Sequence, residues 1–194
     1  MAVPGAYRLQ LSRKRSIGFY MRPKRESMEE YYALLVQIQS DTSEHLPTLR
    51  RLAGQCDTVA ELGTWNGNSA IAMMMGEPKK LISVDINECI WRDRLEMMAG
   101  FFGIDLDIRI EDSRTVDLPD VDMLFVDSDH TYQQVHAELS AHIDKVGAYL
   151  VFHDVLSFPD ICTAIREVAG RDFDLIEDYA NNNGLWVMQR KGTI

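Results

Sequence analysis

The sequence predicts one α/β domain in which helices cover both faces of a mostly parallel β-sheet. Short apolar runs alternate with longer segments of helical periodicity along most of the chain. The run at 121–127, VDMLFVD, is of the apolar type expected for a parallel strand that is buried on both faces. The turn at 181–184, NNNG, separates two further strand-like runs and predicts a terminal hairpin. A length of 194 residues fits a single domain with a sizeable core.

Two helices are expected before the first strand. Apolar residues recur at helical spacing over 27–39, and the polar residues 40–43 then supply turn and N-cap chemistry for a helix at 44–56. Pro47 fits the first turn of that helix, where a missing N–H costs little. The expected strands are 58–63, 81–86, 106–110, 121–127, 147–155, 172–179 and 184–191. Between them, helices are expected at 67–76, 88–102, 132–146 and 159–170.

The charge of the chain is unevenly distributed. The formal net charge is −10, which disfavours general binding to nucleic-acid phosphates. Residues 1–25 nevertheless carry seven basic side chains and no acidic one. We therefore divide the chain into a basic N-terminal arm, 1–27, and a domain, 28–194. Such an arm could fold back on the acidic domain, contact a second copy of the chain in a homodimer, or touch an acidic substrate.

Three features bear on the cellular compartment. No apolar run approaches the roughly 18 residues needed to span a bilayer, so we expect no membrane helix. The basic arm lacks the apolar region of a secretory signal, so export is not indicated. Cys56, Cys89 and Cys162 are odd in number and form no C-x-x-C pair, which fits a reducing, cytoplasmic setting and gives no support to a zinc site.

The segment 59–72, VAELGTWNGNSAIA, predicts a strand, a glycine-bearing turn and the start of a helix. Gly63 and Gly67 stand where a Cβ atom would obstruct a tight turn and the close approach of a ligand. Ser69 lies near the first turn of the helix, where free N–H groups favour electron-rich ligand atoms. Glu61 stands at the carboxyl end of the strand, where open α/β sheets bind ligands.

A second acidic residue is expected at the tip of the next strand. Asp85 follows Gly63 by 22 residues and ends an apolar run. A carboxylate at this place could accept hydrogen bonds from both ribose hydroxyls of a nucleoside. The glycine spacing differs from the G-x-G-x-x-G pattern of dinucleotide enzymes, which disfavours a nicotinamide-dependent oxidoreductase.

The pattern E-x-G-x-x-x-G-x-S at 61–69, followed by V-D-I at 84–86, resembles motifs I and II of the class I S-adenosylmethionine-dependent methyltransferases. The resemblance covers about residues 41–191. It implies a Rossmann-like three-layer sandwich of five strand–helix repeats and a hairpin. Its seven strands would follow the order 3-2-1-4-5-7-6, with the last strand antiparallel. It also implies S-adenosylmethionine as cofactor.

The resemblance places one set of residues at the cofactor. They are Glu61, Gly63, Thr64, Trp65, Gly67, Ser69, Asp85, Ile86, Asp112, Ser113 and Asp127. Asp112, just past the third strand, is the candidate acceptor for the exocyclic amine of adenine; the alternative is that it caps a short helix. Two roles are open for Trp65, covering the cofactor and packing on the sheet. His45 is expected to have a structural role.

Acidic residues at neighbouring strand tips predict a divalent-metal site. Asp127 ends the fourth strand, and His153 and Asp154 end the fifth. Such ligands suit Mg²⁺, and a histidine among them shifts the preference toward Mn²⁺ or another transition metal. The ion would lower the pKa of a substrate hydroxyl and orient it. In the metal-free alternative, Asp127 holds the ammonium of the methionine moiety.

These strand ends resemble the metal-dependent O-methyltransferases. In the catechol type, the fourth strand ends in an Asp that binds the metal, and Asp127 matches it. The lysine that acts as base in that type is replaced here by His130. The Asp-Asn pair at the end of the fifth strand is replaced by His153-Asp154. The strings F-V-D-x-D-H-x-Y and V-F-H-D-V look closer to the bacterial small-molecule branch. His130 is the candidate general base because an unperturbed pKa near 6.5 suits proton abstraction. The alternative is that His130 caps the helix or orients Asp127.

We therefore expect a cytoplasmic methyltransferase that acts on a hydroxyl of a small molecule, with Asp127 and His130 as catalytic residues. The alternatives are a metal-independent N-methyltransferase and an inactive protein that only binds S-adenosylmethionine. The cluster of polar residues at the strand tips speaks against the inactive protein, because a pure binder has no use for it.

Overall fold

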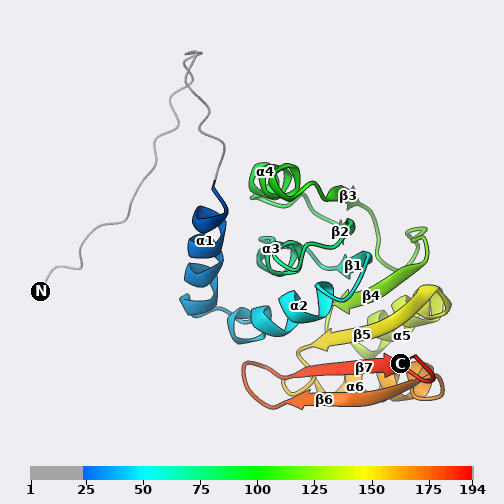
Figure 1. Cartoon of the computed structure of the whole chain (residues 1–194). Coiled ribbons are helices and arrows are strands. Elements are labelled where there is room, and N and C mark those ends of the chain that lie inside the picture. The colour runs from blue at the N-terminus through cyan, green and yellow to red at the C-terminus, as the bar shows by residue number, and fades with distance from the viewer. Residues whose placement is uncertain (1–23, 194) are drawn as a thin grey trace, which may run out of the picture.

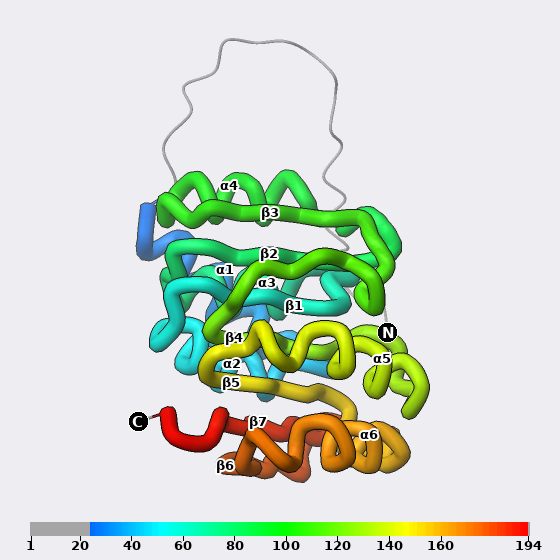
Figure 2. The backbone as a smooth tube through the Cα atoms, turned by 90° about the vertical axis from the view of Figure 1, so that its right-hand side faces the viewer, coloured from blue at the N-terminus to red at the C-terminus, as the bar shows by residue number. Residues whose placement is uncertain are grey.

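The computed structural model describes residues 24–193, which form a seven-stranded sheet between two layers of helices (Figure 1). The strand order is β3-β2-β1-β4-β5-β7-β6, and Figure 2 shows the strands stacked in that order. The predicted fold is therefore confirmed. The strands are β1 (Thr58–Leu62), β2 (Lys80–Asp85), β3 (Asp105–Ile110), β4 (Val121–Val126), β5 (Val146–His153), β6 (Phe173–Tyr179) and β7 (Leu185–Arg190). Strands β1 to β5 are parallel, and β7 pairs antiparallel with both β5 and β6.

Each face of the sheet carries its own helices and its own apolar core. One core joins the sheet to the helices α1 (Arg25–Gln37), α2 (Leu46–Ala53), α3 (Asn68–Met74) and α4 (Arg92–Phe102). The other core joins it to α5 (Tyr132–His142) and α6 (Pro159–Ala169). Short 3₁₀ turns, η1 (Ser43–His45) and η2 (Ile143–Lys145), precede α2 and follow α5.

Neighbouring residues of the central strands face opposite cores. Val59 of β1 and its partner Leu81 of β2 lie in the first core, whereas Ala60 and its partner Ile82 lie in the second. Burial on both faces explains why these strands consist of nearly continuous apolar runs. Because the strands are parallel, their carboxyl ends meet at one edge of the sheet, and the polar residues that follow them are brought together there.

One alternative that the sequence left open is excluded, and one helix begins later than expected. Residues 111–120, between β3 and β4, contain a turn and no helix. The backbone N–H groups of Thr115 and Val116 donate to the carbonyl of Asp112, so this residue does not cap a short helix. Helix α4 begins at Arg92, four residues later than expected, because the chain first makes a turn over 89–92, in which the N–H of Arg92 donates to the carbonyl of Cys89.

The first helix begins at Arg25, within the segment 1–27 that the charge pattern assigned to the basic arm. Residues 1–23 of that arm lie outside the described residues. None of the helices found in residues 24–193 is both long and apolar enough to cross a membrane.

Candidate functional site

The turn after β1 is shaped by close contact with the neighbouring strand β4. Gly63 has φ +98°, and a Cβ atom there would overlap the backbone carbonyl of Asp127. Gly67 has φ +78° and precedes α3, with the side chain of Leu95 packed against it. Both glycines are therefore required by the fold itself, because a side chain at either would be strained or would clash. At Gly63 the close neighbour is the tip of β4.

Asp85 fastens this turn to the tip of β2. Its Oδ2 atom accepts hydrogen bonds from the backbone N–H groups of Thr64 and Trp65, both at 2.9 Å. Its Oδ1 atom accepts one from the backbone N–H of Asn87 at 2.8 Å. The carboxylate thus orders the backbone of two loops around the predicted ribose position.

Replacing Asp85 with Ala is expected to weaken binding of S-adenosylhomocysteine. The change removes the predicted acceptor for the ribose hydroxyls and also the two hydrogen bonds that hold the turn at Thr64 and Trp65. A loss of about 1–3 kcal/mol in binding free energy is expected, because donors of the ligand are left unpaired. Isothermal calorimetry measures it, with far-ultraviolet circular dichroism as the check on folding. Unchanged affinity would remove Asp85 from the ribose role.

Glu61 lies beneath the turn and is fully buried. Its carboxyl accepts hydrogen bonds from Ser69 Oγ at 2.7 Å and from Ser83 Oγ at 2.5 Å. Burial raises the pKa of Glu61 to about 7, against the opposing effect of these two hydrogen bonds. Glu61 therefore ties α3 and β2 to β1 from below and does not line the cavity described next.

Glu61→Gln is expected to change how the stability of the protein depends on pH. The folded state keeps the Glu61 proton up to about pH 7, whereas the unfolded chain loses it near 4.5. As pH rises through this window the wild type loses stability, because its unfolded state binds fewer protons than its folded state. Relative to the variant, it should lose about 2–3 kcal/mol between pH 5 and pH 8. Urea unfolding of both proteins measures this difference, and a constant difference would contradict the account.

A cavity of about 440 Å³ opens at the carboxyl ends of the central strands. Of the residues predicted for the cofactor, it is lined by Gly63, Trp65, Asp85, Ile86, Asp112, Ser113 and Asp127. Thr64 and Ser69 border a smaller adjoining hollow. The cavity is also lined by residues that sequence reasoning did not assign to it: Asp41, Val84, Arg114, Ser128, Asp129 and Gln134. Trp65 lines the cavity and is 66% exposed, so it does not pack on the sheet.

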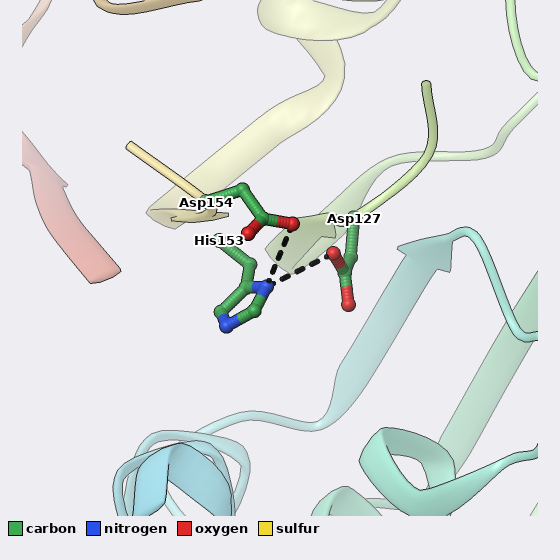
Figure 3. Close-up of side chains that lie close together, drawn as sticks. All are labelled: Asp127, His153 and Asp154. Atoms are coloured by element: carbon green, nitrogen blue, oxygen red, sulfur yellow. Dashed lines mark hydrogen bonds and ion pairs between the residues drawn. The ribbon is translucent and has the colours of Figure 1, made fainter. Parts of the chain in front are cut away.

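The tips of β4 and β5 bring two carboxylates and two imidazoles together. His153 Nδ1 lies 3.2 Å from Asp127 Oδ1 and 3.2 Å from Asp154 Oδ2. Figure 3 draws both contacts as dashed lines. His130 Nε2 lies 2.8 Å from Asp154 Oδ2 and 3.5 Å from Asp127 Oδ1. His153 and Asp154 are buried, whereas His130 is partly exposed and stacks on the ring of Phe158. We call Asp127, His130, His153 and Asp154 the strand-tip cluster.

Within the strand-tip cluster the charges stabilise one another. Hydrogen bonds to Asp127 and Asp154 raise the pKa of His130 to about 9. Burial alone would lower the pKa of His153, but its bonds to the same carboxylates raise it to about 10. Burial alone would raise the pKa of Asp127 and of Asp154. The hydrogen bonds from the two histidines outweigh this effect and hold both pKa values below the ordinary range. The unperturbed pKa assumed for His130 from the sequence is therefore wrong for the protein without ligands, in which this ring keeps its proton at neutral pH.

Three members of the cluster fit a divalent cation. One ligand atom each from Asp127, His153 and Asp154 lies within 4.8 Å of the others. Two carboxylate oxygens and one imidazole nitrogen form a donor set that Mn²⁺ and related ions accept. A cation at this place would take over the charge balance that a proton on His153 provides in the ligand-free protein.

His45 supports the site from outside. It is buried, and its Nε2 lies 3.1 Å from the backbone carbonyl oxygens of both Asn181 and Asn182 in the β6–β7 loop. Its ring also meets that of His153 edge to face. The structural role expected for His45 agrees with these contacts.

The strand order, the glycine turn and the acidic residue at the tip of β2 define a class I S-adenosylmethionine-dependent methyltransferase. A family model described as a methyltransferase domain matches residues 60–155, which contain the turn, Asp85 and the whole strand-tip cluster. Residues 60–155 thus form a methyltransferase domain, and the fold of the chain is the one that class I S-adenosylmethionine-dependent methyltransferases share.

Several solved structures share the fold. TomG from Streptomyces achromogenes, an O-methyltransferase of tomaymycin synthesis in complex with S-adenosylmethionine, has a TM-score of 0.62 at 16% identity, covering 89% of this chain and 93% of TomG. The O-methyltransferase from Bacillus cereus, in complex with S-adenosylhomocysteine, has a TM-score of 0.58 at 14% identity. The match covers 89% of this chain and 94% of that protein. A methyltransferase from Geobacter sulfurreducens has a TM-score of 0.58 at 16% identity, and the match covers 88% of this chain and 91% of that protein. No curated protein sequence matches the chain.

Proposed function

We propose that the protein transfers the methyl group of S-adenosylmethionine to a hydroxyl group of a small molecule, at the strand-tip cluster. One observation carries the proposal. Asp127 lines the cavity and also belongs to the cluster, so the cluster borders the cavity that would hold the cofactor. Two solved structures of the same fold, TomG and the Bacillus cereus protein, are named O-methyltransferases, and this supports oxygen as the acceptor atom.

The cluster suits a hydroxyl acceptor better than an amine. An oxygen nucleophile must lose its proton as the carbon–oxygen bond forms and the carbon–sulfur bond breaks, whereas a neutral amine attacks with its proton in place. Asp127 and Asp154 can accept a hydrogen bond from the hydroxyl, and His130 is the exposed member that can pass a proton to solvent. The orienting role of His130 toward Asp127 remains the alternative.

A divalent cation, if bound, would be held by Asp127, His153 and Asp154. It would supply a positive charge that lowers the pKa of a hydroxyl beside it. The protein residues themselves position the acceptor, exclude water and balance charge: Trp65 lines the cavity, and Asp85 orders the turn beneath the cofactor.

The test is methyl transfer from isotopically labelled S-adenosylmethionine to matched pairs of acceptors that differ only in a hydroxyl or an amine. We expect label on oxygen, and loss of turnover in EDTA that Mg²⁺ or Mn²⁺ restores. Label on nitrogen that is indifferent to EDTA would overturn the proposal in favour of a metal-independent N-methyltransferase. Label on oxygen without any effect of EDTA would keep the acceptor and remove the metal.

A further inference from the structure

A further buried carboxyl lies outside the strand-tip cluster, behind residues that line the cavity. Glu138 of α5 is fully buried. Its Oε1 atom accepts hydrogen bonds from Ser113 Oγ at 2.5 Å, Ser128 Oγ at 2.6 Å and Gln134 Nε2 at 2.9 Å. These three donors come from the loop after β3, the loop after β4 and the first turn of α5, and all three line the cavity. Glu138 thus holds one wall of the cavity from behind.

The same helix holds the loop after β3 at a second point. His142 Nε2 lies 2.6 Å from the backbone carbonyl oxygen of Ser113. Burial raises the pKa of Glu138, against the opposing effect of these three hydrogen bonds. The position of this wall therefore depends on α5.

These contacts fix which way the amide of Gln134 faces. The hydroxyl hydrogens of Ser113 and Ser128 are used on Glu138, so Ser113 Oγ offers only lone pairs to its other neighbour. Gln134 Nε2 donates to that oxygen at 3.0 Å as well as to Glu138. A reversed amide would place its oxygen against two acceptors, which is unfavourable. Within residues 24–193 no hydrogen bond to Gln134 Oε1 is found, whereas Nε2 has two partners. Because Gln134 lines the cavity, this oxygen is an acceptor that a ligand there can use.

The residue that the sequence suggested for the same task is already occupied. Asp112 forms an ion pair with Arg114, in which Nη2 lies 2.6 Å from Oδ2. Its Oδ1 atom also accepts the backbone N–H and Nε of Arg114, at 3.0 Å and 2.9 Å. The hydrogen bonds to Arg114 lower the pKa of Asp112 to about 2. Oδ2 also accepts from Nε of Arg114 at 3.2 Å, so each oxygen of Asp112 already accepts two hydrogen bonds, whereas the oxygen of Gln134 accepts none from the residues that the structure describes.

We propose that Gln134 is the residue that selects an amino-purine in this cavity, by accepting a hydrogen bond from the exocyclic amine of adenine, and that Glu138 is the positioning residue that holds its amide in this orientation. The proposal rests on S-adenosylmethionine as the cofactor. It assigns to Gln134 the role that the sequence had suggested for Asp112. The site should therefore favour a purine with a hydrogen-bond donor at position 6 over one with an acceptor there.

The test compares two ligands, S-adenosylhomocysteine and S-inosylhomocysteine, in which a carbonyl oxygen replaces the amine. The wild type should prefer the adenine ligand. Gln134→Met keeps the length of the side chain and should weaken adenine binding about tenfold, the effect of one hydrogen bond, with little loss for the inosine ligand. The preference would then be largely lost. A preference that survives in Gln134→Met and disappears in Asp112→Asn would overturn the proposal in favour of Asp112.

The role of Glu138 is tested by the same comparison, the ratio of the affinities for S-adenosylhomocysteine and S-inosylhomocysteine. Glu138→Leu should lower the preference for adenine, because the amide of Gln134 is no longer held. Val135→Ala is the matched control: Val135 is buried in the same helix but packs in the apolar core, so this variant should lose thermal stability and keep the preference. An unchanged preference in Glu138→Leu would show a merely structural role. If Glu138→Leu does not fold, Gln134→Met, at a partly exposed position, still decides the assignment.

Failure of this inference is distinguishable from failure of the proposed function. Tight binding of S-adenosylhomocysteine by the wild type, with equal preference in all variants, would overturn only the role of Gln134 and Glu138. Absence of binding by the wild type would overturn both.

Discussion

Replacing Asp154 with Asn is expected to lower kcat by about 100-fold or more, the scale seen when a group that stabilises transition-state charge or takes part in proton transfer is removed. Asp154 lies within hydrogen-bond distance of both histidines of the strand-tip cluster and is a candidate metal ligand. Its loss would leave two protonated imidazoles facing a single carboxylate, Asp127. Steady-state kinetics with the best acceptor found measures the effect.

Asparagine is the appropriate replacement because Asp154 has φ +63°, a left-handed conformation that Asn adopts more readily than Ala. Binding of S-adenosylhomocysteine should change little, since Asp154 does not line the cavity. The exposed Asp160→Asn makes the same change of charge in the following helix α6 and should leave kcat unchanged. Full activity of Asp154→Asn in the presence of EDTA would rule out a role for this carboxylate in catalysis or metal binding.

Gly63→Ala is expected to lower the free energy of unfolding by about 2–5 kcal/mol, from the left-handed backbone and the overlap together. The added methyl group would overlap the carbonyl of Asp127, so the tips of β1 and β4 would have to separate. This separation would also displace the turn that Asp85 fastens, and binding of S-adenosylhomocysteine should fall with stability. Urea unfolding followed by circular dichroism measures the change.

Gly103 provides the matched control for this variant. It has φ +72° at the end of α4, and no atom lies within 4 Å of the position of an added Cβ. Gly103→Ala should therefore cost only the strain of the left-handed conformation, about 1–2 kcal/mol. Equal losses in the two variants would contradict the claim that Gly63 is required by its contact with Asp127.

The fold could be predicted from the sequence because its signals are local. The glycine turn, the apolar runs and the 181–184 hairpin are each contained in a short segment, and parallel strands place their carboxyl ends at one edge. From this alone Asp127, His153 and Asp154 were expected together, and they lie together. Their roles at a cofactor or metal remain predictions that the experiments above test.

What the sequence could not show depends on contacts between distant segments. Gly63 was assigned to a ligand, but its nearest neighbour is the backbone of Asp127, 64 residues away. The high pKa of His130 requires the carboxylate of Asp154 beside it, which no spacing in the sequence reveals. Gln134 was overlooked because its amide is oriented by Ser113 across the fold. The only local signal was its place in the first turn of a helix that follows a strand tip.

The most direct test of the whole account is a calorimetric titration of the wild type with S-adenosylhomocysteine, first with Mg²⁺ or Mn²⁺ and then with EDTA. The account predicts saturable binding to one site with micromolar affinity under both conditions. Heat from the metal alone, abolished in Asp154→Asn, would additionally support the cation site. Absence of any binding of S-adenosylhomocysteine would contradict the assignment of the cavity to this cofactor, and with it the proposed function.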